Sequence, residues 1–333
     1  MSPTKQQLNA IVTGATGFLG GHLCQQLLQQ GWNVSALCRN PEKAQILDSR
    51  INIIIGDVLD TDSFANQVPS NLDALFHTAA STNTWFKNNN MQTKTNIEGV
   101  KNLLKLTVEK QIKRFIHTSS VVVFGMHSEL KNITEGMPKA GKDSWINYVN
   151  TKTATEEIVL NTSNVDAVVI NPTHIIGPGD KNNWARLIRM IAEQKLPSIP
   201  NGAGSFVDVR NVATGIITAF EKGQRGENYL LGGTDLNFKQ FVFKVAEKLN
   251  VQPTKIQLPN FLLKTLAHIK NFISRFTNKE PDITPESVAL ISDLYACDAA
   301  KARKDLNYHT FDFDKSMNDT IAFLISEGLI QQD

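Results

Sequence analysis

Tyr148 and Lys152 stand four positions apart in the segment YVNTK. On a helix this spacing places the phenol and the ammonium on one face. A tyrosine has a pKa of about 10 and is a poor acid or base at neutral pH, whereas a neighbouring ammonium favours the phenolate and lowers that pKa. The pair therefore predicts a proton-transferring tyrosine, and Lys152 could also hold the ribose hydroxyls of a nicotinamide nucleotide.

A serine precedes this pair, at the end of the apolar run RFIHTSS that begins at Arg114. Side chains at the carboxyl end of a parallel strand emerge at the edge where such sheets bind ligands. Ser120 could there donate a hydrogen bond to a substrate oxygen and stabilise the charge that develops on it. The serine and the tyrosine together predict chemistry at a carbonyl or alcohol oxygen.

The segment NAIVTGATGFLG, residues 9–20, supplies the cofactor side of this chemistry. Its glycines follow an apolar run and precede an amphipathic one, which is the order strand, tight turn, helix. Gly14 allows a sharp turn, Gly17 lets backbone N–H groups approach a pyrophosphate, and Gly20 lets the helix pack on the strand. The helix N-terminus favours the negative phosphates. The residues predicted to contact a dinucleotide are Gly14, Thr16, Gly17, Phe18, Leu19 and Gly20.

The end of the predicted second strand, ALCRNPEK, indicates which dinucleotide is bound. In this fold an acidic residue at that point hydrogen-bonds the ribose 2′-hydroxyl of NAD. The chain instead has Cys38, followed by Arg39 and then by Lys43. A guanidinium is always charged and matches a phosphate with two parallel hydrogen bonds. The pattern favours NADP over NAD, and the alternative is an ordinary surface arginine.

The segment after the predicted third strand reads GDV and places Asp57 and Val58 at the cofactor side of the sheet. There the carboxylate of Asp57 could accept a hydrogen bond from the adenine amino group. The alternative role for Asp57 is a helix cap, which Asp60 or Thr61 could also provide.

Small residues follow the predicted fourth strand and would let the backbone lie against the cofactor. They are Thr78, Ala79 and Ala80. His77, just before them, is predicted to be a packed histidine rather than a catalyst. The polar, poorly periodic stretch 83–93 is predicted to be a loop at the same edge, where Trp85 could touch substrate. A plain solvated loop is the alternative.

Apolar runs dense in Ile and Val alternate with helical periodicity up to about residue 175. The predicted strands are residues 10–13, 33–38, 51–55, 74–78, 114–119 and 167–170, and the predicted helices are residues 20–30, 61–67, 95–110 and 150–161. This alternation predicts a parallel sheet covered on both faces, a Rossmann-type doubly wound α/β fold. We expect an NADP-binding domain over residues 1–177, with a returning strand near 206–210. A smaller, mainly substrate-binding lobe is expected over residues 178–333.

Composition limits the class of protein. The chain has 333 residues, 41% hydrophobic and 20% charged, as in soluble globular proteins. A formal net charge of +2 argues against a nucleic-acid partner. An uninterrupted apolar run of about 18 residues is absent, which predicts no membrane insertion. Cys24, Cys38 and Cys297 lack metal-ligand spacing, so we predict no metal site and a reduced, cytoplasmic protein.

Six motifs, TGATGFLG, GDVLD, HTAA, HTSSVVVFG, YVNTK and NPTHIIGPGD, occur in this order. In them the chain resembles the extended short-chain dehydrogenase/reductase (NAD-dependent epimerase/dehydratase) family over nearly its whole length. Within the family it is most similar to the dihydroflavonol-4-reductase-like group, which shares features with 3β-hydroxysteroid dehydrogenases and sugar-nucleotide epimerases. The resemblance implies that Tyr148 is the acid/base and that Lys152 lowers its pKa. It also implies that Ser120 is the catalytic serine, with Ser119 as the alternative.

The resemblance implies further positions and two departures. The residues that it places along the nicotinamide pocket are Asn171, Pro172 and Thr173. Asn96, in TNIEG, matches the family's asparagine on the fourth helix. Asn211 stands where many relatives have an aspartate. This position could be only a structural cap, and we expect catalysis to survive the replacement of the aspartate by asparagine. His174 stands where relatives vary and could face substrate.

The regular alternation lapses after residue 178, and substrate identity is expected to be decided there. The run FLLKTLAHIKNFISRF, residues 261–276, is amphipathic with cations on one face, which could suggest a membrane surface. Prolines at 259 and 281 bound this run, so we prefer a lid or packing helix. The resemblance further implies a homodimer that pairs through helices 95–110 and 150–161.

The leading prediction is an NADP-dependent oxidoreductase. Hydride would pass between nicotinamide C4 and a substrate carbonyl carbon, while Tyr148 transfers the proton and Ser120 holds the oxygen. A second hypothesis is an NAD-dependent sugar-nucleotide epimerase or dehydratase, which uses the same residues through a transient ketone. A third is a non-catalytic NADP-binding protein, against which the retention of Tyr148 and Lys152 argues.

Overall fold

Seven parallel strands form the central sheet of the protein, in the order β10-β7-β5-β4-β1-β2-β3. The computed structural model describes residues 7–331. The strands are β1 (Asn9–Thr13), β2 (Asn33–Cys38), β3 (Asn52–Ile55), β4 (Ala74–His77), β5 (Arg114–Thr118), β7 (Ala167–Pro172) and β10 (Asn228–Leu231). β1 pairs with β2 on one side and with β4 on the other, so the strand order reverses at β1. The predicted Rossmann-type doubly wound fold is confirmed.

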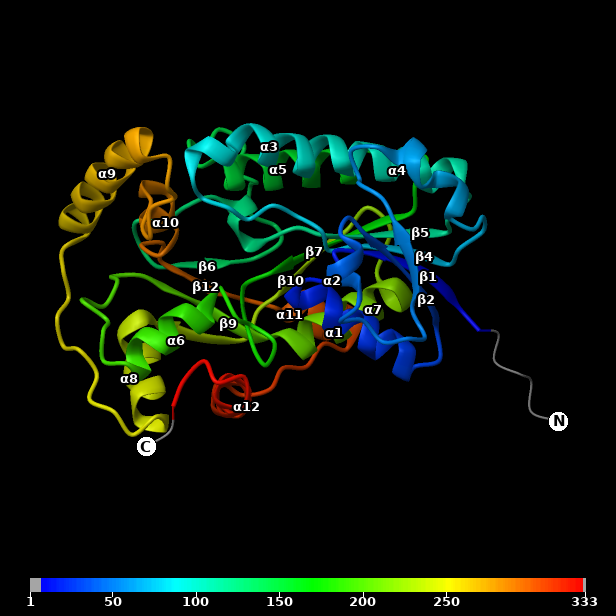
Figure 1. The fold of residues 1–333 in the computed structure, drawn as a ribbon. Helices are drawn as coiled ribbons and strands as arrows, with labels where there is room; N and C mark the ends of the chain where they lie inside the picture. The colour runs from blue at the N-terminus through cyan, green and yellow to red at the C-terminus, as the bar shows by residue number, and fades with distance from the viewer. Residues whose placement is uncertain (1–6, 332–333) are drawn as a thin grey trace.

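Helices cover both faces of this sheet (Figure 1). One face carries α1 (Phe18–Gln29), α7 (Val209–Lys222) and α11 (Ala300–Leu306), and the other carries α4 (Gly99–Glu109) and α5 (Asn147–Leu160). Neighbouring strand residues point to opposite faces. Val12 therefore belongs to the core under α1 and α7, whereas Ile11 belongs to the core under α4. Two covered faces explain why these strands read as continuous apolar runs.

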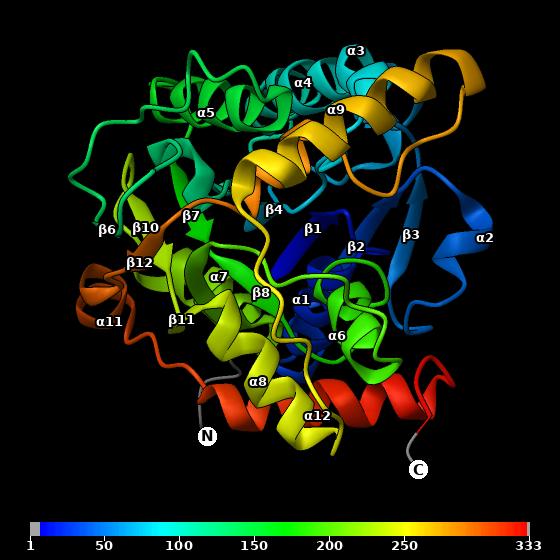
Figure 2. The ribbon, with the colours of Figure 1, turned by 90° about the vertical axis from the view of Figure 1, so that its left-hand side faces the viewer.

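The rest of the chain builds a lobe beyond the carboxyl ends of the strands (Figures 1 and 2). A three-stranded sheet contains β8 (His174–Ile176), β9 (Ala203–Asp208) and β11 (Thr234–Asn237), and a two-stranded sheet contains β6 (Lys131–Ile133) and β12 (Tyr295–Cys297). Its helices are α6 (Trp184–Ala192), α8 (Phe238–Lys248), α9 (Asn260–Thr277), α10 (Pro285–Leu290) and α12 (Phe313–Ser326). Among residues 7–331, no helix combines the length and apolar character that crossing a membrane requires.

The return of the chain to the central sheet differs from the prediction. The strand expected near 206–210 is β9, and it pairs with β8 and β11 in the three-stranded sheet. The segments that return are α7, which packs on α1, and β10, which pairs with β7. All four residues of β10 are buried at that position, which accounts for the apolar NYLL run. The domain boundary at residue 177 stays a prediction.

Two local predictions were wrong. The helix predicted over 61–67 is a pair of 3₁₀ turns, Thr61–Ser63 and Ala65–Gln67, with only Phe64 buried between them. The loop predicted over 83–93 includes a 3₁₀ turn and α3 (Asn89–Thr93), which continues through a π-helical segment, Lys94–Glu98, into α4. The amide of Gln92 donates hydrogen bonds to the carbonyls of Ser81 and Asn83, and such polar contacts leave no apolar periodicity in the sequence.

Candidate active site

The glycine loop joins β1 to α1 as the sequence predicts. Gly14 has a φ of +76°, a left-handed conformation that glycine adopts without strain. A Cβ on Gly20 would lie 2.1 Å from the Gly14 carbonyl oxygen, so only glycine lets the helix approach the loop this closely. Gly17 is the N-cap of α1 and provides no side-chain acceptor. The first N–H groups of α1 therefore have no side-chain cap and are suited to bind an anion, which fits a dinucleotide pyrophosphate.

Arg39 and Asp57 lie together at the carboxyl ends of β2 and β3. Arg39 Nη1 is 3.9 Å from Asp57 Oδ2, and the arginine side chain is 67% exposed. Asp57 Oδ1 accepts from the N–H of Leu59, whereas Asp60 makes no side-chain cap for the turn that follows. Lys43 follows in the short helix α2 (Pro41–Ala44), which Asn40 caps. Arg39 and Asp57 thus meet at the edge where the adenosine is predicted to lie, and Lys43 follows four residues after Arg39.

The residues after β4 pack against the glycine loop. Thr78 Oγ1 donates to the Thr13 carbonyl at 2.8 Å, and a Cβ on Gly14 would lie 2.7 Å from the N atom of Ala79. His77 is buried, with Nδ1 2.7 Å from the Thr13 hydroxyl. Burial and the charge of Lys152 lower the pKa of His77 to about 3, so this ring is neutral. His77 is a packed histidine, as predicted.

The predicted catalytic side chains meet where β5 ends and α5 begins. Tyr148 lies in the first turn of α5, and Lys152 follows one turn later. Lys152 is buried, and its Nζ donates to the carbonyl of Thr118 at 2.8 Å. The Ser120 side chain lies close enough to Tyr148 to lower the pKa of its phenol, and Ser120 Oγ accepts from the Val122 N–H at 3.4 Å. Ser119, the alternative serine, is buried, and its hydroxyl has no partner among residues 7–331.

The pKa shifts of this pair have different causes from those expected. Burial raises the pKa of Tyr148, and the neighbouring Ser120 hydroxyl partly offsets that rise. Burial lowers the pKa of Lys152 to about 8, against the opposing effect of the Glu156 carboxylate. The ammonium of Lys152 contacts the Thr118 carbonyl and makes no contribution to the shift of the Tyr148 pKa. A lysine-induced lowering of the Tyr148 pKa stays a prediction.

Glu156 is a site residue that the sequence reasoning missed. It is buried, and its carboxylate pairs with Lys139 Nζ at 2.6 Å and accepts from Asn171 Nδ2 at 2.6 Å. Asn171 Nδ2 also donates to the Ser120 carbonyl at 3.1 Å. This network connects the serine backbone to α5 behind the catalytic side chains. Glu156 continues the four-residue spacing of Tyr148 and Lys152, and that spacing is the signal that could have revealed it.

Asn96 occupies the π-helical segment Lys94–Glu98 and is buried. Its Nδ2 donates to the Ser81 carbonyl and to Thr151 Oγ1, each at 3.0 Å, and its Oδ1 accepts from the Ser81 N–H at 2.8 Å. Thr151 precedes Lys152 on α5, so Asn96 ties the cofactor-side loop to the helix that carries the lysine. Short π-helical segments are frequent at functional sites.

The model of the NAD dependent epimerase/dehydratase family matches residues 10–232, which include the glycine loop, Tyr148 and Lys152. The chain belongs to this family. The resemblance to extended short-chain dehydrogenases/reductases is therefore confirmed, and the protein is an enzyme of the oxidoreductase class that binds a pyridine nucleotide.

Individual relatives extend over almost the whole chain. A protein of Synechocystis sp. that carries the name dihydroflavonol 4-reductase is 26% identical over 96% of this chain and 95% of its own length. The crystal structure of gox2253 superposes with a TM-score of 0.83 and 27% identity, covering 97% of this chain and 99% of that one. A UDP-glucuronic acid 4-epimerase from Bacillus cereus in complex with NAD has the same fold, with a TM-score of 0.75 and 21% identity over 95% of this chain and 96% of its own.

Two of the candidate substrate residues, Trp85 and His174, make packing contacts. Trp85 is buried, and its Nε1 donates to Ser274 Oγ on α9 at 3.2 Å. His174 is partly exposed, with its ring centroid 4.7 Å from that of Trp184 and 5.4 Å from that of Tyr295. Burial lowers the pKa of His174 to about 3, so the ring is neutral. Contact of either residue with substrate stays a prediction.

Three other predicted positions lie at the end of β7, directly after it and in α7. Pro172 ends β7, and the N–H and hydroxyl of Thr173 both lie 3.3 Å from a carbonyl oxygen of β10. Asn211 does not cap α7, because Asp208 does so by accepting from the N–H of Arg210. The amide oxygen of Asn211 instead accepts from the N–H of Phe311 at 2.8 Å, which is a structural role.

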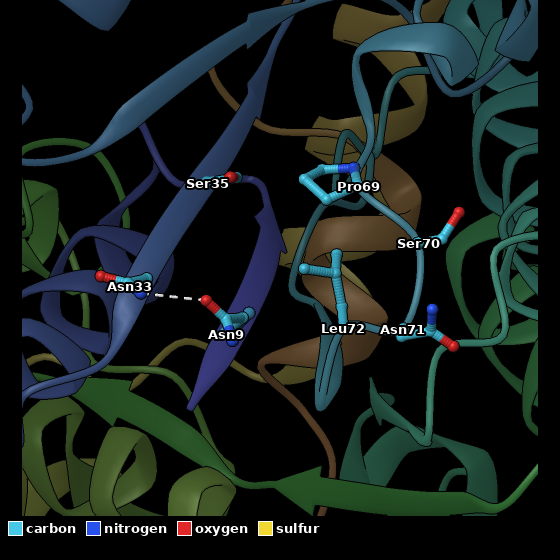
Figure 3. Close-up of a pocket in the computed structure, with 8 residues that line it drawn as sticks. Asn9, Asn33, Ser35, Pro69, Ser70, Asn71 and Leu72 are labelled. Atoms are coloured by element: carbon cyan, nitrogen blue, oxygen red, sulfur yellow. Dashed lines mark hydrogen bonds between the residues drawn. The ribbon is translucent and has the colours of Figure 1, made fainter. Parts of the chain in front are cut away.

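A hollow of about 380 Å³ lies at the opposite end of the sheet (Figure 3). Its lining includes Asn9 and Asn33, the first residues of β1 and β2, which are hydrogen-bonded to each other at 3.0 Å. Open parallel sheets bind ligands at the carboxyl ends of their strands, so this hollow lies outside the candidate active site. No group of three or more His, Cys, Asp or Glu within residues 7–331 could hold a metal ion.

Proposed function

We propose that the protein is an NADP-dependent oxidoreductase that interconverts a carbonyl and an alcohol on a small-molecule substrate, as a dihydroflavonol 4-reductase does. The observation that carries the proposal is that Ser120, at the end of β5, lies beside Tyr148, with Lys152 one helical turn away on the same face of α5. Membership of a family that binds a pyridine nucleotide also supports the proposal. The glycine loop, which would hold the nucleotide, lies at the same edge of the sheet as Ser120 and Tyr148.

Each residue has a distinct part in this reaction. NADP, when bound, supplies or accepts the hydride. In reduction the Tyr148 hydroxyl donates its proton to the substrate oxygen, and the Ser120 hydroxyl donates a hydrogen bond to the same oxygen. The raised pKa of Tyr148 keeps it protonated at neutral pH, which suits an acid. The ammonium of Lys152 stabilises the phenolate that remains and holds the nicotinamide ribose.

The preference for NADP rests on Arg39. Its ion pair with Asp57 is long and exposed, and such pairs contribute only about 0–1 kcal/mol. The guanidinium can therefore turn to a ribose 2′-phosphate at little cost, and Lys43 adds a second cation nearby. Asp57 then remains available to the adenine amino group. The other cofactor contacts are those of the glycine loop, Val58 and residues 78–80.

The proposal is tested by titrating the purified protein with NADPH and with NADH, followed by a carbonyl-substrate screen with the preferred cofactor. We expect tighter binding of NADPH. On a confirmed substrate, Tyr148→Phe should lower kcat by about 10²–10⁴-fold and leave NADPH binding intact. Ser120→Ala should also lower kcat, whereas the matched control Ser119→Ala should not. A Tyr148→Phe enzyme with the wild-type rate would refute the assignment.

A second candidate is an NAD-dependent sugar-nucleotide epimerase or dehydratase. The family description and the shared fold with the NAD complex of a UDP-glucuronic acid 4-epimerase favour it. Purified protein that retains NAD and exchanges no hydride with NADPH in solution would support this candidate over the first.

A homodimer and a cytoplasmic location belong to the same proposal. α4 and α5 pack against each other on one outer face and would pair with the same helices of a second copy. Cys24, Cys38 and Cys297 are all buried free thiols, which suits a reducing compartment.

A further inference from the structure

α9 carries an unusual amount of exposed apolar surface. Seven of its 18 residues are large hydrophobic side chains that are 43–76% exposed. They are Phe261, Leu262, Leu266, Ile269, Phe272, Ile273 and Phe276, and we call them the apolar stripe. At 3.6 residues per turn they cover a sector about 140° wide on one side of the helix.

The apolar stripe points away from the protein. Leu263, Ala267 and Ser274 are the buried residues of α9, and they lie on the side of the helix opposite the stripe. Leu263 and Ala267 pack with Val288 of α10 in a small separate cluster. The preferred packing-helix interpretation therefore accounts for one narrow face of α9 and leaves the exposure of the larger apolar face unexplained.

Cations flank the apolar stripe. By helical spacing Lys264 and Arg275 lie along one border of the stripe, and Lys270 lies beyond the other. Asn260–Thr277 contains no aspartate or glutamate. Lys270 is paired with Asp282 at 2.8 Å, whereas Lys264 and Arg275 are exposed. An apolar face bordered by cations matches a surface that is apolar inside and anionic at its boundary.

α9 is held firmly in this orientation. Figures 1 and 2 show it at the outside of the molecule, beyond the carboxyl ends of the central strands. Trp85 donates to Ser274 at 3.2 Å, and Lys87 Nζ donates to Asn278 Oδ1 at 2.8 Å just past the end of the helix. These bonds join α9 to the segment that follows β4, so the apolar stripe is carried on a fixed support.

We propose that α9 docks on the surface of an anionic lipid bilayer, with the apolar stripe at the acyl boundary and the flanking cations on lipid phosphates. A helix with one apolar and one cationic face lies in the plane of the interface, and anionic lipids strengthen its binding. Because no helix among residues 7–331 could span a bilayer, this contact is peripheral. The proposal is independent of the redox chemistry.

The test is flotation of the full-length protein with phosphatidylcholine vesicles that contain about one third phosphatidylglycerol, and with vesicles of phosphatidylcholine alone. Wild type should float with the anionic vesicles and bind the neutral ones less well. The double variant Phe272→Ser/Phe276→Ser should weaken partitioning about tenfold or more, because two exposed aromatic side chains are lost. The matched control is Ile46→Ser/Leu130→Ser, which removes side chains that are 74% and 66% exposed elsewhere.

A second pair of variants examines charge. Lys264→Gln should weaken binding to the anionic vesicles about fivefold, whereas Lys105→Gln on α4 should not. Every substituted residue is exposed, so melting temperatures should match wild type. Wild type that does not float, or a Phe272→Ser/Phe276→Ser protein that floats equally well, overturns the proposal. Light scattering without vesicles gives a further test. If wild type forms an oligomer that the Phe272→Ser/Phe276→Ser variant does not form, a second copy of the chain covers the apolar stripe and the proposal is overturned.

Discussion

Replacing Glu156 with glutamine perturbs the buried network of Lys139 and Asn171 next to the catalytic side chains. The side chain keeps its size and an oxygen that can accept from Asn171, but it loses the charge that Lys139 pairs with at 2.6 Å. Glu156 is buried, and the Lys139 side chain is 27% exposed. The substitution therefore leaves a largely enclosed ammonium beside the Phe124 ring, without its ion-pair partner and with only the weaker influence of Glu135.

The expected loss of stability follows from that geometry. Removing one partner of a buried ion pair costs about 3–5 kcal/mol. The ammonium of Lys139 retains some access to water, which reduces this to about 2–3 kcal/mol. A hydrogen bond that changes from a charged to a neutral acceptor loses about 1 kcal/mol more. We expect Glu156→Gln to lower the free energy of unfolding by about 3–4 kcal/mol.

Equilibrium unfolding in urea, followed by circular dichroism and tryptophan fluorescence, measures this loss. The control is Glu157→Gln at the next position, because Glu157 and Lys142 form an exposed pair that contributes less than about 1 kcal/mol. The double variant Glu156→Gln/Lys139→Gln should recover part of the loss, since the unpaired cation is gone. Equal losses for the two single glutamine variants would refute the reasoning.

Gly20→Ala should weaken NADPH binding about hundredfold in a fluorescence titration, because the added Cβ would lie 2.1 Å from a loop carbonyl oxygen. The control Gly21→Ala, whose Cβ would lie 3.6 Å from its nearest neighbour, should bind NADPH normally. Arg39→Ser should raise the Kd for NADPH about tenfold and leave that for NADH unchanged; equal changes would contradict a 2′-phosphate contact. The alkaline limb of kcat/KM should lie near pH 8, where Lys152 loses its proton, and a limb above pH 10 would exclude this lysine. Glu156→Gln should move that limb to lower pH, because the carboxylate that raises the lysine pKa is gone.

Much of the fold could be predicted because its signals are local. The strands β1, β2, β4, β5 and β7 are apolar runs close to the predicted positions, and α5 begins three residues before the predicted start. The predictions failed where apolar periodicity was weak or misleading. Hydrogen bonds of Gln92 and Asn96 support the helical segments before α4, and the sequence alone does not show that their acceptors lie nearby.

The sequence by itself determined the turn at Gly14, the shared helix face of Tyr148 and Lys152, and the amphipathic character of α9. These properties depend on the local backbone geometry of a few neighbouring residues. The tertiary structure alone decided that Ser120 lies near Tyr148, that β10 completes the central sheet, and that the apolar stripe faces outward. Each of these depends on contacts between segments far apart in the chain, which residue spacing does not specify.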